Sequence, residues 1–193
     1  GALGVCAACK ANGEHDGAGQ VALALEEAGA DLLAGADIEE GAALRAAGVK
    51  ADILVLGALS VSDLDGLFDC RLTPTISTPG AAHSVQAAAE KYQKRVRYHL
   101  KVDTGMNRLG FRFDNLQRTL PGLLASQNLD LEAVYTHFAT ADDPESPLFG
   151  EHPGRFGRPP PEIGGDRGDR TARRASAPPA RPGPPAVPSR DTP

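Results

Sequence analysis

Four side chains with reactive or anion-binding chemistry stand at or just after the ends of apolar segments. Lys10, Lys101 and His137 each close such a segment, and Arg108 follows seven residues after Lys101. A lysine at the mouth of a buried strand is desolvated, which lowers its pKa and makes its amine a candidate Schiff-base nucleophile. The five donors of an arginine suit a carboxylate. The sequence thus offers a candidate nucleophile and a candidate carboxylate site.

Each of these side chains also has a purely structural interpretation. Lys10 could run its stem along apolar surface to reach water, and Arg108 could stabilise a loop by pairing with Asp103. His137 could be a buried histidine with satisfied hydrogen bonds. The residues taken alone leave both interpretations open, and the other four histidines receive no role.

Strand-like and helix-like segments alternate over the region that carries these residues. Apolar segments of strand length occur at residues 3–9, 32–34, 53–57, 72–77, 96–102 and 131–137. Segments with helical spacing occur at residues 20–28, 38–47, from about 62, 81–92 and 115–125. Six strands that are apolar on both sides and alternate with helices predict a parallel sheet covered by helices.

Two architectures fit this alternation, an open doubly wound sheet and a closed barrel. Lys10, Lys101 and His137 all follow strands, and barrel enzymes gather their chemistry at the carboxyl ends of the strands. An open sheet binds ligands only beside a switch point, where strands one, five and six would not easily meet. We therefore expect an α/β chain of the (β/α)8 TIM-barrel type, incomplete, with about six of eight strands.

A glycine-rich segment supports the competing architecture. Residues 17–22 satisfy a dinucleotide-binding fingerprint in its alanine-ended form, and acidic residues follow about 20 positions later. That fingerprint needs its first glycine directly after the strand, whereas residues 10–16 intervene here. We expect a glycine-rich loop before a helix. Cys6 and Cys9, spaced as a possible redox or zinc pair, are expected to be small buried residues instead.

The segment from Lys101 to Phe111, with its turn Gly-Met-Asn-Arg-Leu-Gly, resembles the fifth-strand signature of alanine racemases. The segment Lys10-Ala11-Asn12, followed by Gly17-Ala18, resembles the first-strand motif of the same family. His137, within Tyr-Thr-His-Phe-Ala-Thr, resembles its sixth-strand histidine. The resemblance implies a pyridoxal-phosphate enzyme that interconverts L-alanine and D-alanine.

The resemblance also implies roles for individual residues. Lys10 would carry pyridoxal phosphate and act as the base on one face of the substrate. Lys101 would be carbamylated and would hold Arg108 near the cofactor hydroxyl and the substrate carboxylate. His137 would pack against the pyridine ring. Glu14 departs from the family, which has there a tyrosine that binds the cofactor phosphate, and a carboxylate would repel that phosphate.

Composition divides the chain into two regions. Residues 1–150 hold 12 basic and 20 acidic residues, whereas residues 151–193 hold eight arginines and five acids. The resemblance stops near Phe156, and the Pro/Arg/Gly-rich remainder has too few apolar residues to offset its ordering entropy. We expect a partial racemase barrel in the first region and a disordered tail in the second. A shifted reading frame in GC-rich DNA is one hypothesis for that tail.

The family draws its last barrel strands, its phosphate-binding loops and the opposing tyrosine base from beyond this break. We therefore expect little or no racemase activity from this chain as it stands. The family implies a homodimer and a supply of D-alanine for peptidoglycan in the bacterial cell wall. No signal peptide or long apolar run is visible, so a cytoplasmic location is expected, without a membrane or nucleic-acid partner. The alternative functions are a non-catalytic cofactor-binding barrel and, with less support, a dinucleotide-binding domain.

Overall fold

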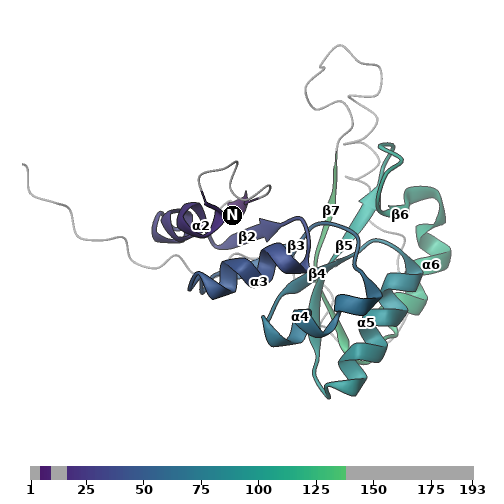
Figure 1. The fold of residues 1–193 in the computed structure, drawn as a ribbon. Coiled ribbons are helices and arrows are strands. Elements are labelled where there is room, and N and C mark those ends of the chain that lie inside the picture. Colours follow the sequence, from purple (N-terminus) through teal and green to yellow (C-terminus); the bar gives the residue numbers. More distant parts are fainter. Residues whose placement is uncertain (1–4, 10–16, 138–193) are drawn as a thin grey trace, which may run out of the picture.

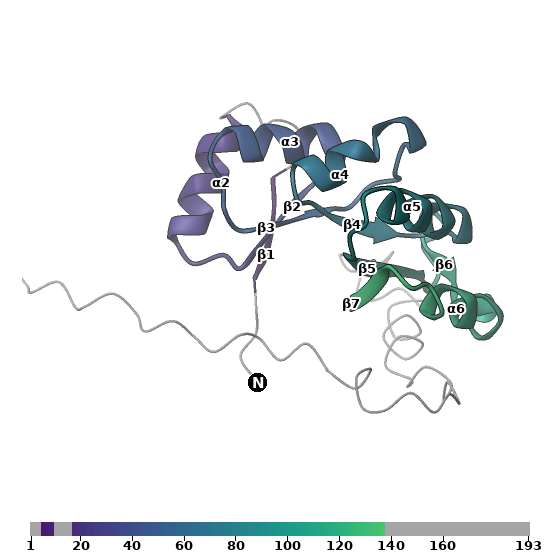
Figure 2. The same ribbon diagram turned by 90° about the horizontal axis from the view of Figure 1, so that it is seen from below.

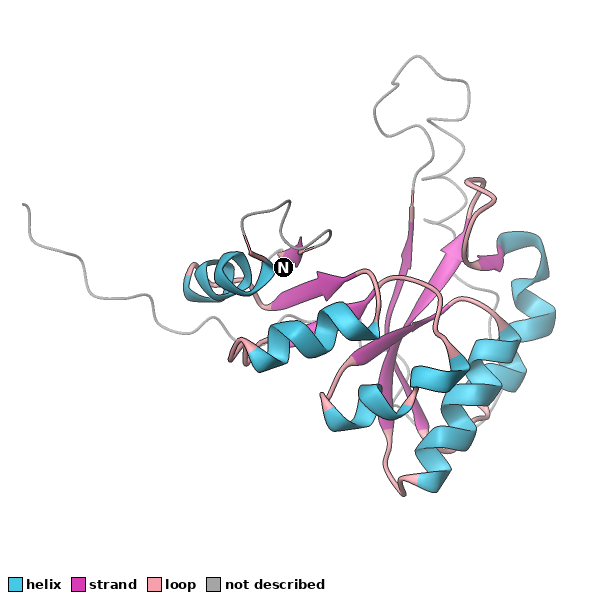
Figure 3. Cartoon of the chain, in the orientation of Figure 1, coloured by secondary structure: helices cyan, strands magenta, loops and turns pink. Residues whose placement is uncertain are grey.

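A computed structural model describes residues 5–9 and 17–137 of the 193-residue chain (Figure 1). Its strands are β1 (Cys6–Ala8), β2 (Leu32–Gly35), β3 (Asp52–Val55), β4 (Thr73–Ile76), β5 (Val96–Asp103), β6 (Phe111–Arg112) and β7 (Leu129–Thr136). Its α-helices are α2 (Ala18–Glu27), α3 (Ile38–Ala46), α4 (Asp65–Asp69), α5 (Pro79–Lys91) and α6 (Leu116–Leu124). Strands and helices alternate as the sequence predicts (Figure 3).

All strand pairs are parallel, and the main strands follow one another in chain order. The path runs from β1 through β2, β3 and β4 to β5, and β7 then pairs with β5. The helices cover one face of this curved sheet, as the view from below shows (Figure 2). A doubly wound sheet carries helices on both faces. Sequential strand order with helices on the outside is the arrangement of a (β/α)8 barrel, and the prediction of that architecture is confirmed within the described residues.

The main core lies between the sheet and this outer layer of helices. Alternate residues of the central strands point toward the helices, as period-two geometry requires. Ile53, Val55, Ile76 and Leu100 are each at most 1% exposed. The helices contribute residues such as Val85 of α5, which is completely buried. This layer uses one face of the sheet and leaves the other face for polar side chains.

Local signals in the sequence account for the helix boundaries. The Asp37 carboxylate accepts a hydrogen bond from the Glu40 amide at 2.8 Å and starts α3, and the Thr78 hydroxyl accepts one from the Ala81 amide at 3.1 Å and starts α5. Such caps satisfy amides that have no partner within the helix. Gly48 follows α3 with φ of +96°, a conformation that glycine adopts without strain.

Two details differ from the sequence-based expectations. β6 is an additional short strand, in which Phe111 pairs with Val102 of β5. Two residues carry too little periodicity to be recognised in a sequence. Cys6 is exposed rather than buried, because it lies on the face of the sheet that none of the described helices covers, whereas Cys9 is 3% exposed as expected. No helix among the described residues has the length and apolar content needed to cross a bilayer.

Candidate functional site

The face of the sheet opposite the helices, called here the inner face, carries the candidate chemistry. Along β5, Tyr98, Leu100 and Val102 join the outer core, so His99 and Lys101 point to the inner face. Lys101 is 6% exposed, although it stands near the carboxyl end of the strand. Burial of an ammonium group is costly unless it is paired or loses its proton. The burial of Lys101 therefore requires either a partner for its charge or loss of its proton.

The neighbours of Lys101 do not include an anionic partner at contact distance. Its Nζ lies 5.7 Å from the centre of the Tyr135 ring, and no hydrogen bond or ion pair joins it to another described residue. Burial lowers the pKa of Lys101, the positive charge of Arg108 lowers it further, and Asp103 acts in the opposite direction. The structure thus favours a neutral amine at this position more than an ordinary lysine environment does.

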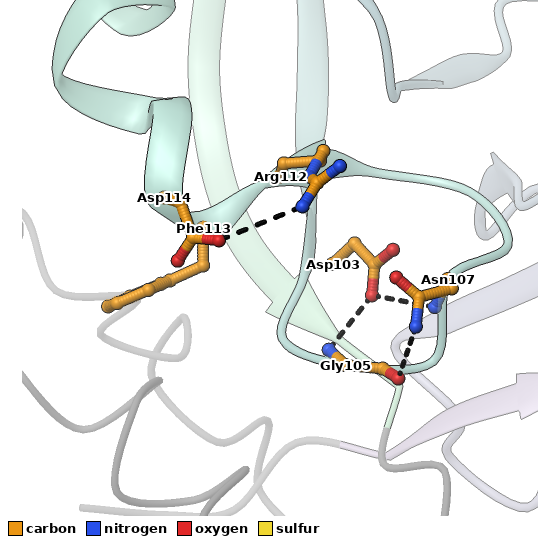
Figure 4. Close-up of a pocket in the computed structure, with 6 residues that line it drawn as sticks. All are labelled: Asp103, Gly105, Asn107, Arg112, Phe113 and Asp114. Atoms are coloured by element: carbon orange, nitrogen blue, oxygen red, sulfur yellow. Dashed lines mark hydrogen bonds and ion pairs between the residues drawn. The ribbon is translucent and has the colours of Figure 1, made fainter.

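A tightly turned loop follows β5 and carries Arg108. Asp103 Oδ1 accepts hydrogen bonds from the amides of Gly105 (2.9 Å) and Asn107 (3.1 Å), and the Asn107 side chain donates to the Gly105 carbonyl (Figure 4). Gly110 has φ of +137°, and a Cβ there would lie 2.6 Å from the Asp103 amide nitrogen. The loop conformation therefore depends on one carboxylate and one glycine.

These contacts decide one question that the sequence left open. No ion pair joins Arg108 to Asp103 among the described residues, because that carboxylate is turned into the loop toward backbone amides. Arg108 is exposed and is close enough to Lys101 to affect its pKa. The same loop borders a small polar pocket lined by Asp103, Asn107 and Arg112, among others (Figure 4).

The remaining predicted residues lie at the same edge of the sheet or outside the described part. His137 is exposed and directly follows β7, two residues after Tyr135, which pairs with Lys101 in the strand register. Lys10 and Glu14 belong to residues 10–16, which lie outside the described residues, as does the predicted tail. The structure therefore brings Lys101, Arg108 and the end of β7 together and leaves Lys10 untested.

Sequence reasoning missed two inner-face residues, Tyr135 and Thr75. The Tyr135 hydroxyl and Thr75 Oγ1 are 2.9 Å apart, and these residues come from β7 and β4. Burial raises the pKa of Tyr135, the hydrogen bond with Thr75 opposes this, and the Cys6 thiol adds to the rise. Tyr135 thus joins β7 to β4 across the inner face, above β5.

A second group of ionisable residues lies toward the amino ends of the strands. Arg97 bonds to Asp52 of β3 at 3.1 Å and to Glu132 of β7 at 2.7 Å, and His99 Nε2 lies 3.3 Å from Glu132. We call Asp52, Arg97, His99 and Glu132 the inner-face cluster. Within the described ranges, no group of three or more His, Cys, Asp or Glu side chains is placed to hold a metal ion.

Comparison with known proteins places this architecture in a family. The sequence matches the family described as "Alanine racemase, N-terminal domain" over residues 2–157. The chain belongs to this family. It is 42% identical over 134 residues to the alanine racemase of Carboxydothermus hydrogenoformans, a stretch that covers 69% of this chain and 36% of that enzyme. It is 41% identical over 140 residues to the alanine racemase of Desulforamulus reducens, covering 72% and 38%.

Solved racemase structures have the same fold. The alanine racemase of Clostridium difficile superimposes with a TM-score of 0.76 and 29% identity, over 80% of this chain and 41% of that one. The Bacillus anthracis enzyme, solved with bound L-Ala-P, gives 0.72 and 33%, over 80% and 40%. The chain thus spans less than half the length of the racemases it matches. The resemblance read from the motifs around Lys101 and His137 is confirmed at the level of the family.

Proposed function

We propose that this chain forms the pyridoxal-phosphate-binding barrel region of an alanine racemase, which interconverts L-alanine and D-alanine. The observation that carries the proposal is Lys101, which is buried at the carboxyl end of β5 without an acidic partner among the described residues. Barrel enzymes place their active sites at this edge. An inner-face lysine next to an arginine loop suits a site for anionic cofactor and substrate groups.

The described residues fit such a cofactor. Pyridoxal phosphate carries a phenolic oxygen and a phosphate, and alanine carries a carboxylate. Lys101 and the exposed Arg108 supply positive charge at the strand ends, and none of the described helices covers the inner face (Figure 2). When bound, the cofactor withdraws electrons from the α-carbon of the amino acid and makes its proton removable.

Each site residue then has a defined task in the proposal. Lys10 holds the cofactor and moves the α-proton on one face of alanine. Arg108 orients the substrate carboxylate with its planar fork of donors. His137 packs against the pyridine ring, for which its position directly after β7 is suitable.

Lys101 acts in the proposal as a carbamate. Its neutral amine attacks the carbon of CO2, a new N–C bond forms as one C–O π bond breaks and leaves its electron pair on oxygen, and one proton leaves the nitrogen for solvent. The product is an anion that can hold the guanidinium of Arg108. The lowered pKa of Lys101 supports this reaction, because only the neutral amine is nucleophilic.

The proposal extends to partners that the comparisons do not test. The substrate is alanine, the assembly is a homodimer, and the product D-alanine serves peptidoglycan synthesis in the cytoplasm of a bacterium. Because the chain spans 36% of the length of the Carboxydothermus hydrogenoformans enzyme, we expect these residues alone to bind cofactor and to turn over little or no alanine.

The test is to incubate the chain with pyridoxal phosphate, reduce it with borohydride and map the labelled peptide. We expect one stable label, at Lys10. Lys10→Arg should lose the label, and the exposed Lys50 is an internal control that should remain unlabelled. A label on Lys50 equal to that on Lys10 would contradict a specific site.

Two further readouts separate the functions that remain. An assay of D-alanine formation from L-alanine tests turnover, and a Lys10 label without turnover supports a barrel region that binds cofactor but does not catalyse by itself. Absence of any Lys10 label would overturn the proposal. The 13C NMR signal of a carbamate after addition of 13C-bicarbonate, absent in Lys101→Ala, tests the role of Lys101 separately.

A further inference from the structure

Tyr135 contacts both polar groups of the inner face. Lys101 Nζ lies 5.7 Å from the centre of its ring. The ring of His99, the member of the inner-face cluster next to Lys101 along this face of β5, meets it edge-on with 6.5 Å between centres. His99 in turn lies 3.3 Å from Glu132. The Tyr135 ring therefore lies near both Lys101 and His99 on the inner face.

A hydrogen bond holds this ring in place. The Tyr135 hydroxyl and Thr75 Oγ1 are 2.9 Å apart, and Thr75 is 1% exposed. Thr75 belongs to β4, two strands away from β7 with β5 between them. The phenol thus crosses the inner face above β5 and is anchored at both ends, by its own backbone and by the threonine.

We propose that Tyr135, anchored by Thr75, is a positioning residue for Lys101: its ring covers the amine on the inner face and keeps the lysine away from water. A ring that covers the amine keeps from it the water that would stabilise its charged form, in agreement with the neutral amine that burial favours at this position. Any effect of Tyr135 on racemisation rests on the proposed function, whereas the shielding of Lys101 by the Tyr135 ring does not.

The proposal predicts how the ionisation of Lys101 responds when the ring is removed. The charged groups that act on Lys101 are Arg108 and Asp103 from its own strand and loop, and removal of the Tyr135 ring admits water to the amine. Water favours the charged amine, so the pKa of Lys101 rises toward that of an exposed lysine. A role limited to packing would change stability and leave this pKa unchanged.

The experiment is competitive labelling of the full 193-residue chain with trace acetic anhydride across a pH series in CO2-free buffer. Mass spectrometry then gives the labelling midpoint of the Lys101 peptide relative to the exposed Lys50. For Tyr135→Leu we expect the midpoint to rise by about one pH unit. Tyr135→Phe and Thr75→Val keep the ring and should each raise the midpoint by less. The double variant should have the same midpoint as either single variant, because both substitutions remove the same hydrogen bond.

Tyr98→Phe is the matched control. Tyr98 is equally part of a strand of this sheet and is 1% exposed, but it points to the outer core, so its hydroxyl should not affect Lys101. An unchanged midpoint in Tyr135→Leu, with circular dichroism like that of the parent chain, would overturn the proposal. Additive shifts in the double variant would also overturn it. If the midpoint of Lys101 rises in Tyr135→Leu as expected but no cofactor label forms at Lys10, the proposed function is refuted and the role of Tyr135 is not.

Discussion

Replacement of a leucine by alanine on the outer face of the sheet should have very different costs on two neighbouring strands. Leu100 of β5 is 1% exposed, whereas Leu131 of β7 is 39% exposed on the same face. Leu→Ala removes three carbon atoms. Full burial is worth about 0.8 kcal/mol for each of them, and the cavity left behind adds to this loss.

We expect Leu100→Ala to lower the free energy of unfolding by about 3–4 kcal/mol and Leu131→Ala by about 1 kcal/mol. The measurement is urea unfolding followed by circular dichroism at 222 nm, with the slope against urea compared between variants to confirm the same transition. The two variants control for each other, because they share residue type, face and strand environment apart from burial.

Equal costs would refute the reasoning. If Leu131→Ala lost as much stability as Leu100→Ala, the outer side of β7 would be covered in solution as completely as that of β5. If Leu100→Ala lost less than about 1 kcal/mol, the layer between sheet and helices would not be the main core.

Four further substitutions test other parts of the structure. Gly57→Ala should destabilise the chain by about 2 kcal/mol or more, since its Cβ would lie 2.3 Å from a backbone carbonyl oxygen. Gly122→Ala, which has open space around it in α6, should stabilise the chain by about 0.5–1 kcal/mol. Thermal unfolding of both variants measures the contrast. Thr78→Ala should cost about 1 kcal/mol in the same assay by removing the cap of α5, and a cost near zero would contradict that cap. Burial lowers the pKa of His99 below 6.5, so the unfolded chain binds the proton more tightly than the folded one. The free energy of unfolding should therefore fall as the pH drops from about 6.5 through the lower pKa of the folded state. In His99→Gln the free energy of unfolding, measured with urea, should depend less on pH in this range, and an unchanged pH dependence would contradict the shift.

Much of the fold could be predicted because its signals are local. Alternating apolar segments, the caps at Asp37 and Thr78 and the stop at Gly48 each depend on a few neighbouring residues. Parity along β5 also shows which residues share a face, so Lys101 could be separated from Leu100 without a structure. The motif at Lys101 led in the same way to the family.

The contacts of the site could not be predicted from such signals. Thr75 and Tyr135 are 60 positions apart, and Arg97 and Asp52 are 45 apart. Their pairing depends on strand order and register, which no local pattern specifies. The short strand β6 and the exposure of Cys6 likewise depend on strand pairing and on which face of the sheet the helices cover, rather than on residue type.

The amino-acid sequence by itself determined the order of strands and helices, the alternation of faces and the chemistry available at the strand ends. Only the tertiary structure decided that the helices cover one face, that Lys101 is buried without an acidic partner in the described residues, and that Tyr135 lies against it. The physical reason is that propensity and periodicity act over a few residues, whereas burial and pKa depend on groups that only the packed sheet brings together.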